Sequence, residues 1–200
     1  MLIDISRKID ENTFVYPGDP VTKINEICNI KNDGFRLSEL SLCLHTSTHI
    51  DFPSHFLEDG KTSSDYSDIN YFIGKVIVVD LNNFPKNIQE EWDSIFIKTN
   101  NKIEKSMKKY KSINEGMLKF LVDNKVKFIG TDFYTIEPSD SDDFYFHKEL
   151  LKNNVLIIEN LDLSMLNEGF YDYYIFPLKL ERTEASICRI AVKKQKTLKK

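Results

Sequence analysis

The sequence predicts a single mixed α/β domain, and three observations support this fold class. The chain has 200 residues, 41% of them hydrophobic, which is enough to bury one substantial core. Short segments rich in β-branched and aromatic residues recur along it, separated by polar and turn residues. A helical pattern at 114–124 is followed directly by a strand pattern at 127–131, which makes an αβ unit. Since there is no internal repeat or inner linker, one domain is expected over residues 1–192.

Strands are expected where a short apolar segment is bounded by polar or turn residues. These segments are Leu2–Ser6, Thr22–Ile27, Phe35–Leu44, Lys75–Leu81, Ser94–Lys98, Lys127–Thr131, Val155–Ile158, Tyr173–Leu178 and Ile187–Val192. The clearest helix is expected at Asn114–Asn124, where apolar residues recur at helical spacing. A shorter helix is expected from His147 to Lys152. Another is expected over Ser164–Glu168, with Gly169 as its C-terminal cap.

Composition and charge exclude several classes of protein. The net charge of −4 argues against a nucleic-acid-binding domain. No apolar run approaches the roughly 20 residues of a membrane helix, and the N-terminus lacks a secretory signal pattern, so a cytoplasmic protein is expected. Three scattered cysteines, Cys28, Cys43 and Cys188, indicate reduced thiols and include no C-x-x-C pair of a zinc finger.

The last eight residues, 193–200, contain five lysines. Such a run can contact nucleic acid or a membrane surface, or it can be a solvated terminus. No aromatic residue or arginine accompanies the lysines, so a disordered basic tail is the favoured interpretation.

The four histidines are the main functional signal. His45, His49 and His55 lie within eleven residues together with Asp51, and His147 follows about ninety residues later. Histidine is the commonest metal ligand, and although any one of them can be a surface residue, the cluster favours metal binding. The segment is rich in Thr, Ser and Ile and ends at a proline, which indicates extended backbone.

Extended backbone places alternate side chains on one face, so His49 and Asp51 lie roughly 6–7 Å apart and can share one ion. In a straight strand His45 and His49 would lie roughly 13 Å apart, which two imidazoles barely bridge. The chain is therefore expected to bend near Ser47.

The segment His45-Thr-Ser-Thr-His49-Ile-Asp51-Phe-Pro53-Ser-His55-Phe56 resembles the H-x-G-T-H-x-D-x-P-x-H-F signature of the cyclase-like metal-dependent hydrolases. That family includes bacterial kynurenine formamidase (arylformamidase) and isatin hydrolase. Further segments resemble the family in the same order: Asp4-Ile-Ser6, Val15-Tyr-Pro-Gly-Asp-Pro20, Phe128-Ile-Gly-Thr-Asp132, His147-Lys-Glu-Leu-Leu151, Val155-Leu-Ile-Ile-Glu159-Asn-Leu161, Phe176-Pro-Leu-Lys-Leu180 and Arg189-Ile-Ala191. Two departures are Ser47 in place of the usual glycine and Lys98-Thr99-Asn100 where the family often has Arg-Thr-Gly.

The resemblance implies a swivelling β/β/α architecture and a metal centre. It implies one ion on His45, His49 and Asp51, with Asp51 bridging to a second ion on His147 and Glu159. The ion is expected to be Zn, with Mn as the alternative, and one or two ions are expected per chain. Taken singly, His147 also fits a surface residue at a helix start, and Glu159 fits a charge at a strand end.

The resemblance makes His55 the proton shuttle of a hydrolase that cleaves a small non-peptide amide, as arylformamidases cleave N-formylkynurenine in tryptophan catabolism. The alternatives are hydrolysis of another cyclic amide, lactam or ester, and a non-catalytic protein that binds a metal or ligand. Expected partners are a small-molecule substrate and further copies of the chain in a dimer or tetramer, with active sites near the subunit contact. No nucleic acid or membrane partner is expected.

Aromatic residues near the motif suit either an aromatic substrate pocket or the core. They are Phe14, Tyr16, Phe52, Phe56 and Tyr66. The run 169–176 is also rich in aromatic residues and is expected to bury alternate side chains, in the core or at a subunit interface.

Overall fold

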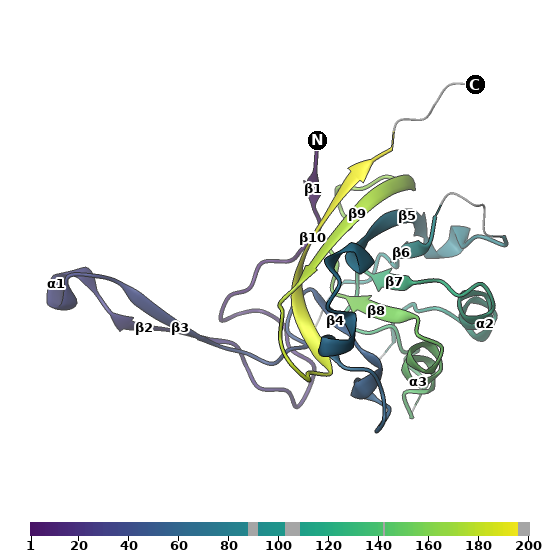
Figure 1. Cartoon of the computed structure of the whole chain (residues 1–200). Helices are drawn as coiled ribbons and strands as arrows, with labels where there is room; N and C mark the ends of the chain where they lie inside the picture. The colour runs from purple at the N-terminus through teal and green to yellow at the C-terminus, as the bar shows by residue number, and fades with distance from the viewer. Residues whose placement is uncertain (88–91, 103–108, 142, 196–200) are drawn as a thin grey trace.

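In the computed structural model, which describes residues 1–87, 92–102, 109–141 and 143–195, one sheet forms the body of the protein. The sheet has eight strands in the order β1-β10-β4-β8-β7-β6-β5-β9, and β9 also pairs with β10, so the sheet closes on itself (Figure 1). The strands are β1 (Ile3–Asp4), β4 (His49–Asp51), β5 (Ile73–Asp80), β6 (Ser94–Lys98), β7 (Phe128–Thr131), β8 (Leu156–Glu159), β9 (Gly169–Pro177) and β10 (Ala185–Lys194).

Strands β5, β6, β7 and β8 are parallel, whereas β4, β9 and β10 pair antiparallel with their neighbours. The helices α2 (Glu115–Asp123) and α3 (Tyr145–Lys152) lie beside β7 and β8, away from β9 and β10 (Figure 1). Strands β6, β7 and β8 are therefore buried along nearly their whole length, which explains their continuous apolar sequences. The predicted mixed α/β domain is confirmed.

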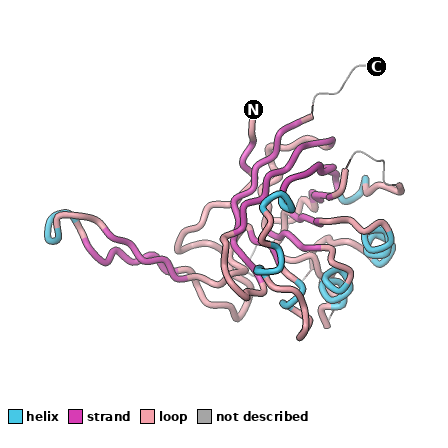
Figure 2. The backbone as a smooth tube through the Cα atoms, viewed as in Figure 1, coloured by secondary structure: helices cyan, strands magenta, loops and turns pink. Residues whose placement is uncertain are grey.

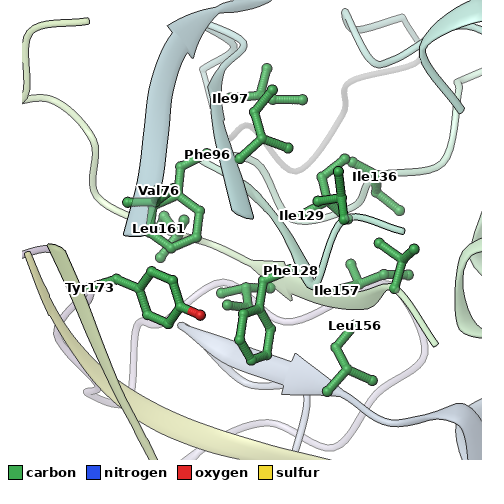
Figure 3. Close-up of a cluster of buried hydrophobic side chains, with 14 of the residues drawn as sticks. Val76, Phe96, Ile97, Phe128, Ile129, Ile136, Leu156, Ile157, Leu161 and Tyr173 are labelled. Atoms are coloured by element: carbon green, nitrogen blue, oxygen red, sulfur yellow. The ribbon is translucent and has the colours of Figure 1, made fainter. Parts of the chain in front are cut away.

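The core contains a group of aromatic rings among aliphatic side chains (Figure 3). The Phe128 ring meets the Tyr173 ring edge to face, with centroids 5.6 Å apart, and Phe96 packs beside them (Figure 3). Gly130 on β7 allows this packing, because a Cβ there would lie 2.5 Å from Cδ1 of Phe96. The Tyr173 hydroxyl donates a hydrogen bond to Oδ1 of Asp93 (3.0 Å), so the one polar group of this cluster is satisfied.

Residues 23–41 form an arm that extends away from the body (Figures 1 and 2). The arm contains β2 (Lys23–Cys28), one helical turn α1 (Ile30–Asp33) and β3 (Leu37–Ser41), and β2 and β3 form a separate two-stranded sheet. The sequence did not predict α1, which is held by Asn29 at its N-terminus and by Gly34 with φ +77° at its C-terminus. Both faces of the ribbon are exposed, so the arm adds nothing to the core.

Four 3₁₀ turns lie at Pro53–His55, Ser63–Tyr66, Ile69–Phe72 and Leu81–Asn83. Within the described residues, no helix has the length and apolarity needed to cross a membrane.

Most predicted elements are confirmed, with shifts at their ends. Strand β6 has the predicted bounds, and Asn114 caps α2 by accepting a hydrogen bond from the backbone of Met117 (3.1 Å). Helix α3 begins at Tyr145, two residues before the predicted start. Strand β9 begins at Gly169, before the predicted Tyr173, and places Tyr171, Tyr173 and Ile175 in the core, as alternation predicts.

The helix predicted over Ser164–Glu168 is wrong. Residues 164 and 165 form a turn, because Asp162 Oδ1 accepts hydrogen bonds from the backbone and hydroxyl of Ser164 (3.1 and 2.6 Å). Gly169 has φ +137° and starts β9, so it does not cap a helix.

The predicted tail begins later than residue 193. Lys193 and Lys194 pair with Asp172 and Tyr171 in the β9–β10 ladder, so the last strand continues past the predicted domain boundary at 192. Residues 196–200 lie outside the described residues.

Candidate active site

Strand β4 brings the first three predicted ligands together. His49 and Asp51 lie on this buried strand, and His45 precedes it in a tight turn. Ser47, with φ +60°, makes the predicted bend and brings the His45 and His49 rings to a centroid separation of 5.0 Å. One ligand atom from each of His45, His49 and Asp51 lies within 4.8 Å of the others, so the three can hold one ion.

The sheet topology brings in the two distant predicted ligands. Strand β8 pairs with β4 in the register His49↔Glu159, which places Glu159 beside the first group. His147 reaches the same place from α3, with Nε2 3.2 Å from Oε1 of Glu159. Asp51, His147 and Glu159 form a second group within 4.8 Å, so Asp51 belongs to both groups.

The polar atoms at the centre have no protein partner that satisfies them. Asp51 Oδ1 lies 3.0 Å from His45 Nδ1 and 3.4 Å from His49 Nε2, yet neither contact has hydrogen-bond geometry. Asp51 Oδ1 and His49 Nε2 are therefore buried and unsatisfied within the described part of the chain. Such atoms are costly to bury, and imidazole with carboxylate is a donor set that Zn and Mn accept. The residues present fit a divalent ion.

Neighbouring groups orient two of the imidazoles. His49 Nδ1 donates to the carbonyl oxygen of Ser47 (2.8 Å), and His147 Nδ1 donates to Oε2 of Glu137 (2.6 Å). With a metal ion bound, each ring would keep its proton on Nδ1 and offer the Nε2 lone pair to the ion. The bend at Ser47 thus has two effects. It brings His45 close to His49, and it places the Ser47 carbonyl oxygen where it orients the His49 ring.

Glu137 is the functional residue that the sequence did not reveal. Its side chain is buried and accepts hydrogen bonds from the backbone amides of Phe146 and His147 (3.2 Å each), so it also caps the N-terminus of α3. Burial raises the pKa of its carboxyl, but the hydrogen bonds from His147, Ser141 and the Phe146 backbone, with the charge of His147, together lower it below the usual value. The only sequence signal was a carboxylate ten residues before His147, which does not by itself indicate contact.

We predict that Glu137→Gln weakens metal binding by about 10–100-fold, the usual effect of removing a carboxylate that orients a ligand histidine. A chelator competition titration measures this affinity. The matched control is Glu149→Gln on the same helix, since Glu149 contacts only Lys152 (3.7 Å) among charged groups of the described chain. Equal affinities in Glu137→Gln and the unmodified protein would contradict the orienting role.

The charges of the site favour a cation. Burial disfavours protonated His45 and His147, yet the neighbouring carboxylates outweigh burial and raise the pKa of His45 to about 9 and that of His147 to about 10. Burial likewise favours protonated Asp51, but the imidazoles of His49 and His45 hold its pKa well below the usual value. The carboxylate at the centre is therefore ionised and available to a metal ion.

His55 behaves differently from the other three histidines. It lies at the end of the 3₁₀ turn after Pro53, outside both ligand groups, with its ring centroid 4.2 Å from that of His45. Burial and the adjacent His45 and His147 lower its pKa to about 4, against the opposing effect of Asp51. His55 is therefore neutral at pH 7 and can accept a proton.

All six predicted site residues line one cavity of about 240 Å³. The remaining walls are Phe14, Tyr16, Asp19, Phe56, Tyr134, Thr135, Phe144 and Asn160. Of the five aromatic residues considered from sequence, Phe14, Tyr16 and Phe56 line this cavity, whereas Phe52 and Tyr66 are buried in the core. The cavity thus offers aromatic walls around a cluster of side chains that could hold a metal ion.

Comparisons with known proteins agree with this geometry. Kynurenine formamidase of Bacillus cereus is 26% identical over 202 residues, which cover 96% of this chain and 96% of that protein. The solved structure of a potential metal-dependent hydrolase with cyclase activity matches with a TM-score of 0.79 and 26% identity, covering 98% of each chain. Isatin hydrolase A from Labrenzia aggregata, solved with benzyl benzoate, has a TM-score of 0.79 at 16% identity, covering 98% of this chain and 94% of its own.

The isatin hydrolase likeness supports the fold alone, whereas a family model assigns the family. The model for putative cyclases matches residues 3–138, which hold His45, His49, Asp51 and His55. Because this match covers more than half of the chain, and whole-length relatives share the remaining strands, the chain belongs to the putative cyclase family.

Proposed function

We propose that the chain hydrolyses the amide bond of small aryl formamides, as the name of the similar kynurenine formamidases describes. The observation that carries the proposal is a single cavity in which two metal-binding groups and a neutral histidine face aromatic walls. Flat, apolar rings suit such walls, and the small polar end of the substrate would lie among the ligands.

The metal centre that we propose holds Zn, with Mn as the alternative, on His45, His49 and Asp51, and a second ion on Asp51, His147 and Glu159. A divalent ion there would supply Lewis acidity, which promotes the ionisation of water near neutral pH and polarises a carbonyl group. The unsatisfied Asp51 Oδ1 and His49 Nε2 support this assignment.

In this proposal His55 moves the proton. Being neutral at pH 7, it accepts a proton from the attacking water on an imidazole nitrogen and donates it to the amide nitrogen. The water oxygen bonds to the carbonyl carbon, and the C–N bond then breaks as the C=O double bond re-forms. The products are an aryl amine and formic acid, which releases its proton to solvent as formate. The rings of Phe56 and His55, with centroids 4.2 Å apart, pack against each other on this side of the cavity.

A hydrolysis screen on protein reconstituted with Zn or Mn tests the function. The screen compares N-formylkynurenine and formanilides with lactams and with aryl esters, and aryl formamides are expected to react fastest. Faster reaction of a lactam or an ester would favour the alternative, in which the chain hydrolyses a cyclic amide, lactam or ester. No hydrolysis with either ion would favour a metal-binding or ligand-binding role without catalysis.

We also propose that copies of this chain assemble into a dimer or tetramer through the arm at residues 23–41. An isolated two-stranded ribbon is marginally stable in water. This ribbon nevertheless exposes large apolar side chains at fractions of 41% to 55%, namely Ile24, Ile27, Phe35, Leu37 and Leu40. Contact with a second copy of the chain would bury them.

We also propose that the protein acts in the cytoplasm, in tryptophan catabolism. Its three free thiols suit a reducing compartment.

The double variant Leu37→Glu/Leu40→Glu is expected to sediment as a monomer of 23.4 kDa at low micromolar concentration, whereas the unmodified chain sediments at twice that mass or more. Charges placed in an apolar contact oppose its burial. Ser67→Glu/Ser139→Glu adds the same charge at exposed positions outside the arm and should leave assembly unchanged. A monomeric unmodified protein with full activity would contradict any need for a second chain at the site.

A further inference from the structure

Asn160 lies directly after the ligand Glu159 and has an unusual backbone. Its φ is +58°, in the left-handed region that only Gly, Asn and Asp tolerate readily. Two hydrogen bonds hold it there: its N–H donates to the carbonyl of Phe133 (2.8 Å), and its carbonyl accepts from the Thr48 hydroxyl (2.7 Å). Since Thr48 precedes the ligand His49, the position of Asn160 is tied to both metal-binding strands.

The side-chain amide of Asn160 is left free by this arrangement. The residue is only 5% exposed, and among the described residues its amide has no hydrogen-bond partner. Asn160 lines the cavity that holds His45, His55 and Glu159. Buried amides normally find a partner, so an unpaired amide on a cavity wall is available to a bound molecule.

The choice of asparagine at position 160 indicates which kind of group its side chain can bind. Glycine would also fit the left-handed backbone but offers no side chain, and aspartate would add a negative charge next to Asp51 and Glu159. Of the three residues that this backbone favours, only asparagine supplies a neutral N–H donor beside the ligands. A neutral donor on the cavity wall suits a carbonyl oxygen whose negative charge grows during attack by water.

We propose that Asn160 donates a hydrogen bond from Nδ2 to the carbonyl oxygen of the substrate amide. This role rests on the proposed amide hydrolysis and adds a catalytic residue to it. Asn160 would then bind the carbonyl side of the scissile bond while His55 serves the nitrogen side.

Steady-state kinetics with formanilide on metal-loaded protein test the role. Asn160→Gly removes the amide while keeping the backbone favourable, and kcat should fall by about 10²–10³-fold, with a smaller change in KM. Asn160→Asp replaces the donor by an acceptor and should lose as much. Metal content and melting temperature should match those of the unmodified protein in Asn160→Gly.

Asn154→Gly is the matched control, because Asn154 also has φ +58° but is exposed and lies outside the cavity. It should retain full activity. Asn160→Gly with kcat within threefold of the unmodified protein would overturn the proposal. So would a loss of bound metal in that variant, since Asn160 would then act only by supporting Glu159.

Binding of benzamide separates this inference from the proposed reaction. Benzamide carries an aromatic ring and a carbonyl but no formyl group, so its affinity can be measured by calorimetry whether or not formanilides react. Asn160→Gly should bind it about fivefold more weakly, the effect of one hydrogen bond. Equal affinity, or no binding to the unmodified protein, overturns the role of Asn160, whereas binding without any formanilide hydrolysis overturns only the proposed function.

Discussion

Asp51→Asn is expected to abolish both metal binding and hydrolysis. Asp51 is the one residue shared by the two ligand groups, so its loss leaves each with two members instead of three. Turnover should fall by more than about 10³-fold, because several kcal/mol of charge stabilisation depend on the ion. Elemental analysis of the purified variant, beside activity on the best substrate of the screen, gives both readouts.

The control is Asp123→Asn, which removes an exposed carboxylate of α2 that pairs only with Lys119 (2.8 Å) among the described residues. It should keep both metal and activity. His49→Gln serves as a second variant if Asp51→Asn folds poorly, since His49 belongs only to the first group. Full hydrolysis by a metal-free variant would show that the reaction does not use this centre.

The sequence predicted the parts of the fold whose pattern is local. Ser94–Lys98 is a short apolar segment with polar ends, and β6 has those bounds because both of its faces are buried. Helix α2 (Glu115–Asp123) is amphipathic and has Asn114 as its N-cap, so the sequence also predicted where it begins and ends. The arm differs, because its apolar residues have no core to face and its strand pattern therefore carries no information about packing.

The closeness of the predicted site residues could be derived from the sequence to different degrees. His49 and Asp51 are two residues apart on a strand, so spacing alone places them on one face. Glu159 joins them only because β4 and β8 are neighbours in the register His49↔Glu159, which the family resemblance implied and spacing did not. Glu137 and Asn160 depend on how the turn before α3 and the end of β8 fold over the site, and no sequence period marks such contacts.

His55→Ala is expected to separate proton transfer from metal binding. His55 lies in the cavity but outside both ligand groups, so the variant should keep its metal while turnover falls by about 10²–10⁴-fold, the usual contribution of general acid–base catalysis. The removed ring leaves space beside His45, whose ring centroid is 4.2 Å away, so added imidazole should restore part of the activity. His45→Ala provides the contrast, because it should lose the metal and should not respond to imidazole. Elemental analysis and kinetics with and without imidazole measure all of these effects. Loss of metal from His55→Ala would instead make His55 a ligand, and the proton would then have to pass through another group of the cavity.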